Sequence, residues 1–457
     1  MNFIENLKNR EKLIISLFLG KYNCYGEIYL EENIPTIRML TFDNIKTDQE
    51  FTEIQKEIEK DCIYFSEYGR CDGVKFTLLN FFGYKEHSYS KKDWRNLIFK
   101  YKIIITDEVD NLEKIYNNCD FLLEIGSFDD WFIYKDFKEP VWEKNYYQFT
   151  HSYSNIESIF LENCKIQIEK RIEIKSTKNS HSLKYKYYFI ISSNDLKKPL
   201  NILQIIKLGN SLSKFISFLT RSFSRIKDLK IEFENPEKDI QYFDNDFSNE
   251  DEHKKIGSYS GPLNFYDIEN KFLETFSKFK TFYTKNPYPI DIFLSDSLIK
   301  KQPGIYKFLH LFIALENFAE EDKKDIISKK KKPTNKEILE HYVKKFENIN
   351  YVENFKKTSL FEKWLKNNNL VRIAEARNHY THGSKNSPFK KPFIDENSEG
   401  LYAFYFMKCL LEHIILYKLG FSENFLLSLW SRNDNKIPSM SFYYNNICNF
   451  STYKFKS

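Results

Sequence analysis

The sequence predicts an α+β protein, with a β-rich first part followed by an all-α helical bundle. Short runs of β-branched and aromatic residues fill positions 1–290, as in a sandwich or barrel-like domain. Apolar residues at helical spacing fill about 300–430, as in a bundle of amphipathic helices. Gly (13) and Pro (12) are scarce among 457 residues, which favours regular structure over linkers. We expect domains at 1–290 and 300–430 and a C-terminal tail at 431–457, whose role the sequence leaves open.

Strands are expected along most of the first part. The segment Lys165–Lys175 alternates apolar and polar residues, which predicts a half-buried strand with one wet face. Polar turns separate the strands, as in antiparallel sandwiches and barrels. The segments with strand composition are Glu27–Leu30, Cys62–Phe65, Val74–Phe82, Leu97–Thr106, Asp120–Ile125, Trp131–Tyr134, Ile156–Leu161, Ile166–Lys175, Tyr185–Ser193 and Lys230–Glu234.

One helix interrupts these strands, at about 199–226. Pro199 suits the first turn, and apolar residues follow at spacings of three and four despite Gly209 in the middle. We expect this helix to pack on the preceding sheet. The polar, acidic stretch 235–262 is expected to be an exposed loop or an extended excursion.

The second part has helical patterns separated by short breaks. Phe308, Leu311, Phe312 and Leu315 share one stripe, and Thr334-Asn-Lys-Glu337 has the form of a capping box. The helices are expected at Tyr306–Phe318, from Thr334 onward, at Thr358–Tyr380, at Leu401–Leu419 and at Phe425–Trp430.

Charge and cysteine content set broad limits on function. The net charge of +5 gives only weak support for an anionic partner. Seven scattered cysteines without a C-x-x-C pair indicate neither a disulfide framework nor a zinc site, and they fit a reducing cytosol. The apolar run Leu13–Gly20 is too short to cross a bilayer. We therefore expect a cytoplasmic protein that uses no membrane anchor, metal or cofactor.

The segment Glu375–Gly383 carries the strongest functional signal. Asn378 and His382 lie four residues apart and so share a helix face, whereas Arg377 lies about 140° round from His382. The long Arg377 side chain can still swing toward the same place. An arginine, an asparagine and a histidine together can bind a phosphate, orient a hydroxyl and move a proton, which is the chemistry of metal-independent RNA cleavage.

Each of the three residues has an expected catalytic role. His382 lies near the end of its helix, where the negative end of the dipole suits a histidine that carries and releases a proton. Arg377 would neutralise the phosphate in the transition state, and Asn378 would fix the imidazole or bind a phosphate oxygen. The same trio could instead cap and bridge a helix interface without catalysing a reaction.

The segment Arg377-Asn378-His379-Tyr380-Thr381-His382 resembles the R-x4-6-H motif of HEPN-domain ribonucleases, and its surroundings are similar to the Apea-like branch. The helix around Phe308–Phe318 resembles the first bundle helix of that family, in which an acidic residue often faces the site. Glu316 matches that position. Members of the branch place a β-rich domain before the HEPN bundle and act in abortive defence against phage.

This resemblance implies a toxin-like endoribonuclease with antiviral function. The expected partners are an RNA substrate, with tRNA among the candidates, a second copy in a homodimer or higher homo-oligomer, and a phage-encoded trigger. The β-rich domain would sense the trigger and hold the nuclease in check. The alternative is a non-catalytic HEPN scaffold that dimerises and binds a ligand or a phage protein. A weaker third reading is a sugar-binding β-sandwich with a helical tail.

Other polar residues have less specific expectations. Arg372 and His379 also satisfy the looser spacing, but His379 is expected to line the site rather than to catalyse. The basic run Lys329, Lys330, Lys331 and Lys332 is either an RNA contact or a solvated loop. His310 and His413 lie on apolar helix faces and are expected to be core or interface residues.

Overall fold

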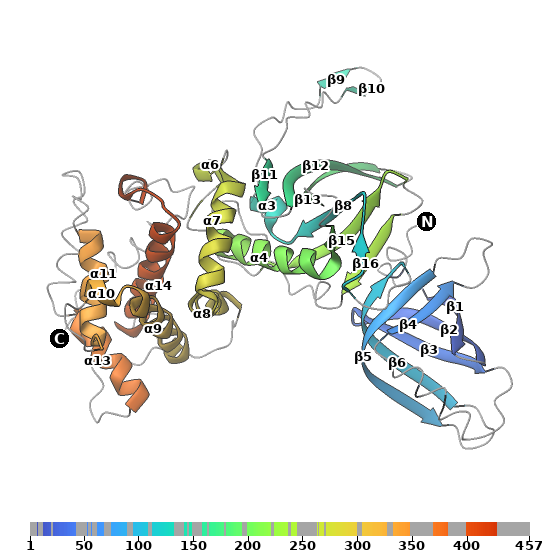
Figure 1. The fold of residues 1–457 in the computed structure, drawn as a ribbon, viewed down its shortest axis with the longest axis horizontal. Helices are drawn as coiled ribbons and strands as arrows, with labels where there is room; N and C mark the ends of the chain where they lie inside the picture. Colours follow the sequence, from blue (N-terminus) through green and yellow to red (C-terminus); the bar gives the residue numbers. More distant parts are fainter. Residues whose placement is uncertain are drawn as a thin grey trace. The chain divides into compact units, whose positions relative to one another are not determined.

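The computed structural model divides the chain into two compact units (Figure 1). The β unit comprises residues 1–126, 153–210 and 225–253, and the helical unit comprises 127–152, 211–224 and 254–457. The structure describes residues 7, 12–19, 22–42, 53, 56, 62–67, 75–88, 95–107, 112–131, 141–143, 146–148, 158–161, 164–177, 180–193, 199–220, 224–235, 239–244, 263, 265–268, 271–298, 304–326, 332–347, 369–382 and 399–426.

The first strands of the β unit close into an antiparallel barrel, drawn in blue in Figure 1. Their order is β6-β3-β2-β1-β4-β5, and β5 pairs back with β6, so this set has no free edge. Ile28, Ile37, Phe76, Leu78 and Tyr101 are buried. The barrel strands are β1 (Leu13–Leu19), β2 (Tyr22–Glu31), β3 (Ile34–Phe42), β4 (Cys62–Glu67), β5 (Lys75–Ser88) and β6 (Arg95–Ile105).

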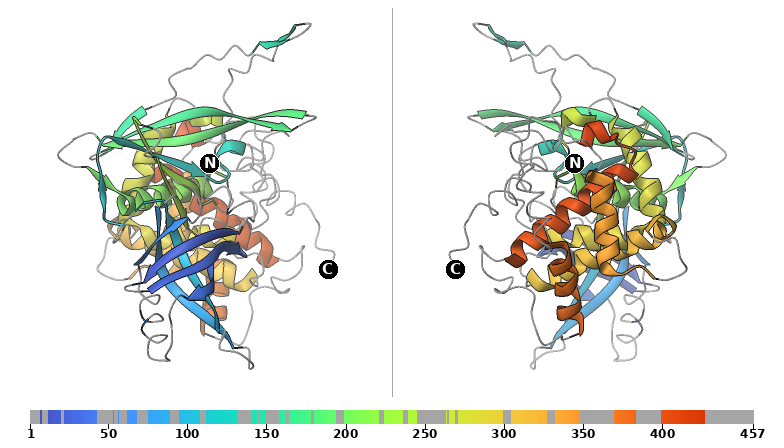
Figure 2. Two further views of the ribbon diagram at one scale, coloured as in Figure 1. Left: turned by 90° about the vertical axis from the view of Figure 1, so that its right-hand side faces the viewer. Right: turned by 90° about the vertical axis from the view of Figure 1, so that its left-hand side faces the viewer.

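A second group of strands continues from the barrel through β6 and runs in the order β16-β15-β8-β13-β12-β11. Its centre is apolar on both faces, since Phe121, Leu122 and Leu123 are all buried in β8. Figure 2 shows the β12–β13 hairpin as a long twisted ribbon. The strands are β8 (Cys119–Ile125), β11 (Ser158–Leu161), β12 (Cys164–Thr177), β13 (Ser180–Ser193), β15 (Ile226–Phe233) and β16 (Ile240–Asp244).

Helix α4 (Ile202–Thr220) begins on one face of this second sheet. Asn201 caps it, because its Oδ1 accepts the Gln204 N–H at 2.9 Å while Gln204 Oε1 accepts the Asn201 N–H at 3.0 Å. A Cβ atom at Gly209 would lie 2.6 Å from Ile226 Cδ1 and 3.1 Å from Leu123 Cδ1. The glycine therefore allows the helix to approach the sheet closely.

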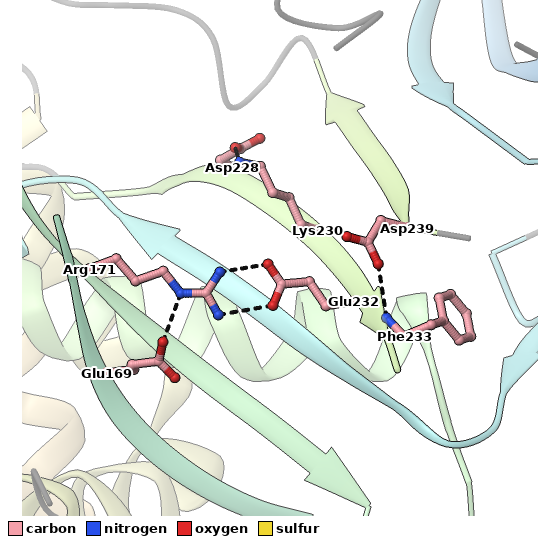
Figure 3. A network of polar contacts seen from close by, with 7 residues as sticks. All are labelled: Glu169, Arg171, Asp228, Lys230, Glu232, Phe233 and Asp239. Atoms are coloured by element: carbon pink, nitrogen blue, oxygen red, sulfur yellow. Dashed lines mark hydrogen bonds and ion pairs between the residues drawn. The ribbon is translucent and has the colours of Figure 1, made fainter. Parts of the chain in front are cut away.

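The opposite face of the same sheet carries a network of charges (Figure 3). The Arg171 guanidinium on β12 donates to both oxygens of Glu232 on β15, at 2.6 and 2.9 Å, and to Glu169 at 2.8 Å. These bonds to Glu232 raise the pKa of Arg171. Strands β12 and β15 lie three places apart in the sheet, so the long Arg171 side chain reaches across the strands between them and lies over the Tyr188 ring of β13. Leu122, Tyr188 and Ile190 form a buried cluster on this face.

The remaining strands form two short pairs, β7 (Ile115–Tyr116) with β14 (Leu200–Asn201) and β9 (Val141–Glu143) with β10 (Tyr146–Gln148).

The helical unit has an aromatic core built around Phe215, which lies in the second half of α4. The Phe215 ring centroid lies 5.1–5.8 Å from those of Phe272, Phe276 and Phe279. Lys214, one residue earlier, pairs with Asp291 at 2.7 Å. The helices of this region are α3 (Phe128–Trp131), α6 (Phe265–Ile268), α7 (Phe272–Lys285) and α8 (Pro287–Leu298).

The later helices surround α9, which packs against α8, α11, α13 and α14. The Asp322 carboxylate at the end of α9 joins three of them, because it accepts from Tyr342 Oη at 2.8 Å and from Lys418 Nζ at 3.0 Å. These helices are α9 (Gly304–Glu321), α10 (Lys323–Ile326), α11 (Asn335–Glu347), α13 (Asn369–His382) and α14 (Glu399–Lys418), and residues 423–426 are also helical.

The α+β class is confirmed, with antiparallel strands first and helices after them. Several local expectations were wrong. Trp131 ends helix α3 instead of starting a strand, and its buried ring donates from Nε1 to the Leu263 carbonyl at 3.1 Å, a partner far away in sequence. The stretch 235–262 was expected to be exposed, but it contains β16, whose Ile240, Tyr242 and Phe243 are buried and which pairs with β6 and β15. The helix expected to reach 226 ends at Thr220.

Other expectations fall outside the described residues, namely 358–368 of the Thr358–Tyr380 helix, residues 427–430 and the tail 431–457. The domain bounds 1–290 and 300–430 stay predictions. In the part of the chain that the structure describes, no helix is both long and apolar enough to cross a membrane.

Candidate active site

Helix α13 carries the residues singled out by the sequence. Its buried side consists of Ile373, Ala374 and Ala376, whose spacing places them against α9 and α11. Arg377 follows directly and is partly buried, whereas Asn378 and His382 are exposed. The Thr381 hydroxyl donates to the Arg377 carbonyl at 2.6 Å, one turn back along the helix. The last turn of α13 thus presents polar groups beside a packed apolar side.

Arg377 lies between Glu316 and His382. Its Nη2 is 2.8 Å from Glu316 Oε1 and 3.1 Å from Oε2, so the guanidinium grips the carboxylate of α9. Its Nη1 is 3.4 Å from His382 Nε2. The 140° offset expected from helix geometry is therefore overcome within one chain by the length of the arginine side chain. The structure brings together three of the residues that the sequence singled out, from two helices.

Asn378 is hydrogen-bonded to Asn335, a residue that the sequence pattern did not single out. Its Oδ1 accepts a hydrogen bond from Asn335 Nδ2 at 3.1 Å, and Asn335 is the first residue of α11. The capping box expected at Thr334 is confirmed, because the Glu337 carboxylate accepts from the Thr334 N–H at 2.7 Å and from its hydroxyl at 2.8 Å. Only the tertiary packing of α11 on α13 brings Asn335 to the site, so local sequence gave no signal.

The other candidate residues lie less centrally. The ring of His379 meets that of its neighbour Tyr380 edge-on, at 5.0 Å between centroids. Of the basic run, Lys332 is exposed, and positions 329–331 lie outside the described residues. His413 is buried in α14, and this burial lowers its pKa to about 3, which keeps the ring neutral near pH 7.

The arrangement brings cationic, amide and imidazole groups to one exposed stretch of helix. The guanidinium can bind a phosphate oxygen, and the imidazole can accept or deliver a proton a few ångströms away. Glu316 balances the arginine charge and fixes its direction. Among the residues described, no group of three or more His, Cys, Asp or Glu side chains is arranged to hold a metal ion.

Comparison with known proteins identifies the domain that carries these residues. The model of the Apea-like HEPN family matches residues 290–425, a stretch that begins in α8 and includes Glu316, Asn335 and the whole of α13. Neither the curated proteins nor the solved structures gave a match to the chain. HEPN domains are generally ribonucleases, and they typically bind RNA and dimerise. The resemblance noted in the sequence is thereby confirmed, and residues 290–425 carry the match to the Apea-like HEPN family.

Proposed function

We propose that the protein is a metal-independent endoribonuclease that acts in abortive defence against phage. The observation that carries the proposal is the Glu316–Arg377–His382 cluster within the matched HEPN domain, with Arg377 Nη1 at 3.4 Å from His382 Nε2. The exposure of Asn378 and His382 supports catalysis over a purely structural role, because both side chains are accessible to a substrate from solvent. The scaffold alternative accounts for the bonds of Arg377 to Glu316 and of Asn378 to Asn335, but it gives the exposed His382 no role.

In the proposed reaction, His382 removes the proton from a ribose 2′-hydroxyl. The 2′-oxygen then attacks the adjacent phosphorus, and the bond from phosphorus to the 5′-oxygen breaks. Arg377 stabilises the negative charge that gathers on the phosphate oxygens. The 5′-oxygen leaves with a proton from an imidazolium, so the products are a 2′,3′-cyclic phosphate and a 5′-hydroxyl. In a homodimer, two copies of His382 could share the roles of base and acid.

Control of the nuclease is assigned in this proposal to the β unit, because a toxic activity must be held in check until infection. The domain order supports this assignment. The barrel and the second sheet offer a large surface separate in sequence from the HEPN domain, and a phage-encoded component would act there as the trigger.

Growth of infected bacteria tests the proposal as a whole. Cells that express the wild-type protein are expected to stop growing after infection and to show discrete new cuts in their RNA. Cells that express Arg377→Ala are expected to do neither. Equal behaviour of the two strains would contradict the proposal and favour the scaffold.

Glu316→Gln is expected to separate the positioning of Arg377 from the binding of RNA. The amide keeps the size of the side chain but loses the charge that directs Arg377, so kcat is expected to fall about tenfold. Loss of a negative charge beside a polyanion is expected to lower KM. Steady-state cleavage of a short RNA measures both constants.

Glu320→Gln is the matched control, because Glu320 is exposed one turn further along α9. Its kcat is expected to stay within about twofold of wild type, as for most exposed charges. An unchanged kcat for Glu316→Gln would show that the carboxylate does not position Arg377.

A further inference from the structure

The start of helix α11 is held rigidly beside the candidate active site. The capping box between Thr334 and Glu337 fixes the first turn, and Glu337 N–H donates back to Thr334 Oγ1 at 3.3 Å. Two turns later, the buried Tyr342 donates from its hydroxyl to Asp322 at the end of α9. Burial raises the pKa of Tyr342, so the hydroxyl keeps its proton. Helix α11 is thus anchored to α9, the helix that also carries Glu316.

Asn335 is the residue through which this anchored helix meets α13. Its Nδ2 donates to Asn378 Oδ1 at 3.1 Å, and Asn378 is the neighbour of Arg377 in sequence. A carboxamide has one oxygen that accepts and one NH2 group that donates. With the oxygen bonded to Asn335, the group that the exposed Asn378 can offer to a ligand is its NH2.

The direction of this hydrogen bond leaves Asn378 with a donor group that suits a phosphate. Phosphate oxygens at neutral pH only accept hydrogen bonds, so an outward NH2 binds them, whereas an outward amide oxygen repels them. We propose that Asn335 is a positioning residue that fixes the Asn378 amide with its NH2 toward the phosphate that Arg377 binds. This inference rests on the proposed ribonuclease function and adds a residue that neither the motif nor the family match singles out.

Asn335→Asp tests the inference, because a carboxylate can only accept. The Asn378 amide must then turn its NH2 toward residue 335 and its oxygen toward the RNA. Cleavage, measured as kcat/KM on a short RNA, is expected to fall about tenfold to a hundredfold. Thermal stability is expected to hold or rise, because an acidic residue in the first turn of a helix is favourable. A merely structural role for Asn335 predicts the opposite pattern, with cleavage retained.

The double variant Asn335→Asp/Asn378→Ala separates this effect from simple repulsion between the new carboxylate and RNA. If Asn335 acts through Asn378, the aspartate is expected to cause no further loss beyond that of Asn378→Ala alone. Lys344→Ala, an exposed change later in α11, serves as the control and is expected to cleave like wild type.

Two outcomes would overturn the inference: wild-type cleavage by Asn335→Asp, or an equal loss from the aspartate with and without Asn378. Both leave the ribonuclease proposal standing, since the wild type still cleaves. If the wild-type protein itself cleaves no RNA, both the ribonuclease proposal and this inference fail.

Discussion

Replacing His382 with alanine is expected to slow RNA cleavage by about 10²–10⁴-fold, which is the usual contribution of a general acid–base group. The methyl side chain cannot take the 2′-hydroxyl proton, and it also removes the imidazole 3.4 Å from Arg377 Nη1. His382 is exposed at the last residue of α13, so little change in stability is expected. Single-turnover kinetics measure the change in cleavage rate, and the melting temperature measures the change in stability.

His379→Ala is the matched control for this change, because His379 lies on the same helix turn but beside Tyr380. Its cleavage rate is expected to fall far less than that of His382→Ala, because a residue that only lines the site transfers no proton. If His379→Ala were inactive and His382→Ala active, the catalytic histidine would be His379, and Arg372 would be the arginine of the motif.

Replacing Phe215 with alanine is expected to lower the free energy of unfolding of the helical unit by about 3–5 kcal/mol. The side chain is fully buried, and its ring meets those of Phe272, Phe276 and Phe279 at 5.1–5.8 Å between centroids. Its removal leaves a cavity where α4 and α7 meet. Because domains are typically stable by only about 5–15 kcal/mol, a substantial share of the stability margin would be lost.

Denaturant unfolding of the full chain measures this loss, with Tyr288→Ala as the control. Tyr288 lies in the same unit and is 60% exposed, so its replacement is expected to cost no more than about 0.5 kcal/mol. Phe215→Leu is expected to recover part of the loss, because it fills part of the cavity. Equal unfolding curves for Phe215→Ala and Tyr288→Ala would contradict the aromatic core.

Strong local patterns predicted the elements that need no distant partner. The capping box at Thr334 and the stripe of Phe308, Leu311, Phe312 and Leu315 both appear as expected, because helices are specified by neighbours three and four residues apart. The sequence left a sandwich and a barrel open, and it predicted neither strand β16 nor the β5–β6 pairing that closes the barrel, since strand pairing joins residues far apart in sequence.

The residues of the candidate site also divide into those that local sequence predicts and those that only tertiary packing brings together. Arg377 and His382 lie on one helix, so their spacing alone indicated that they could meet, and the structure places them together. Glu316 was found through the family resemblance, because nothing local connects residues 61 positions apart. Asn335 remained hidden, since its approach to Asn378 depends on how α11 packs on α13. The catalytic roles of these residues stay predictions.

The most direct measurement of the central claim is the cleavage of a defined RNA by the purified wild-type protein in excess EDTA, with the chemistry of both new ends determined. We predict cleavage that resists the chelator and leaves a 2′,3′-cyclic phosphate and a 5′-hydroxyl, as attack by the 2′-oxygen requires. Cleavage that stops on chelation and leaves 5′-phosphate ends, or no cleavage at all, would contradict the account.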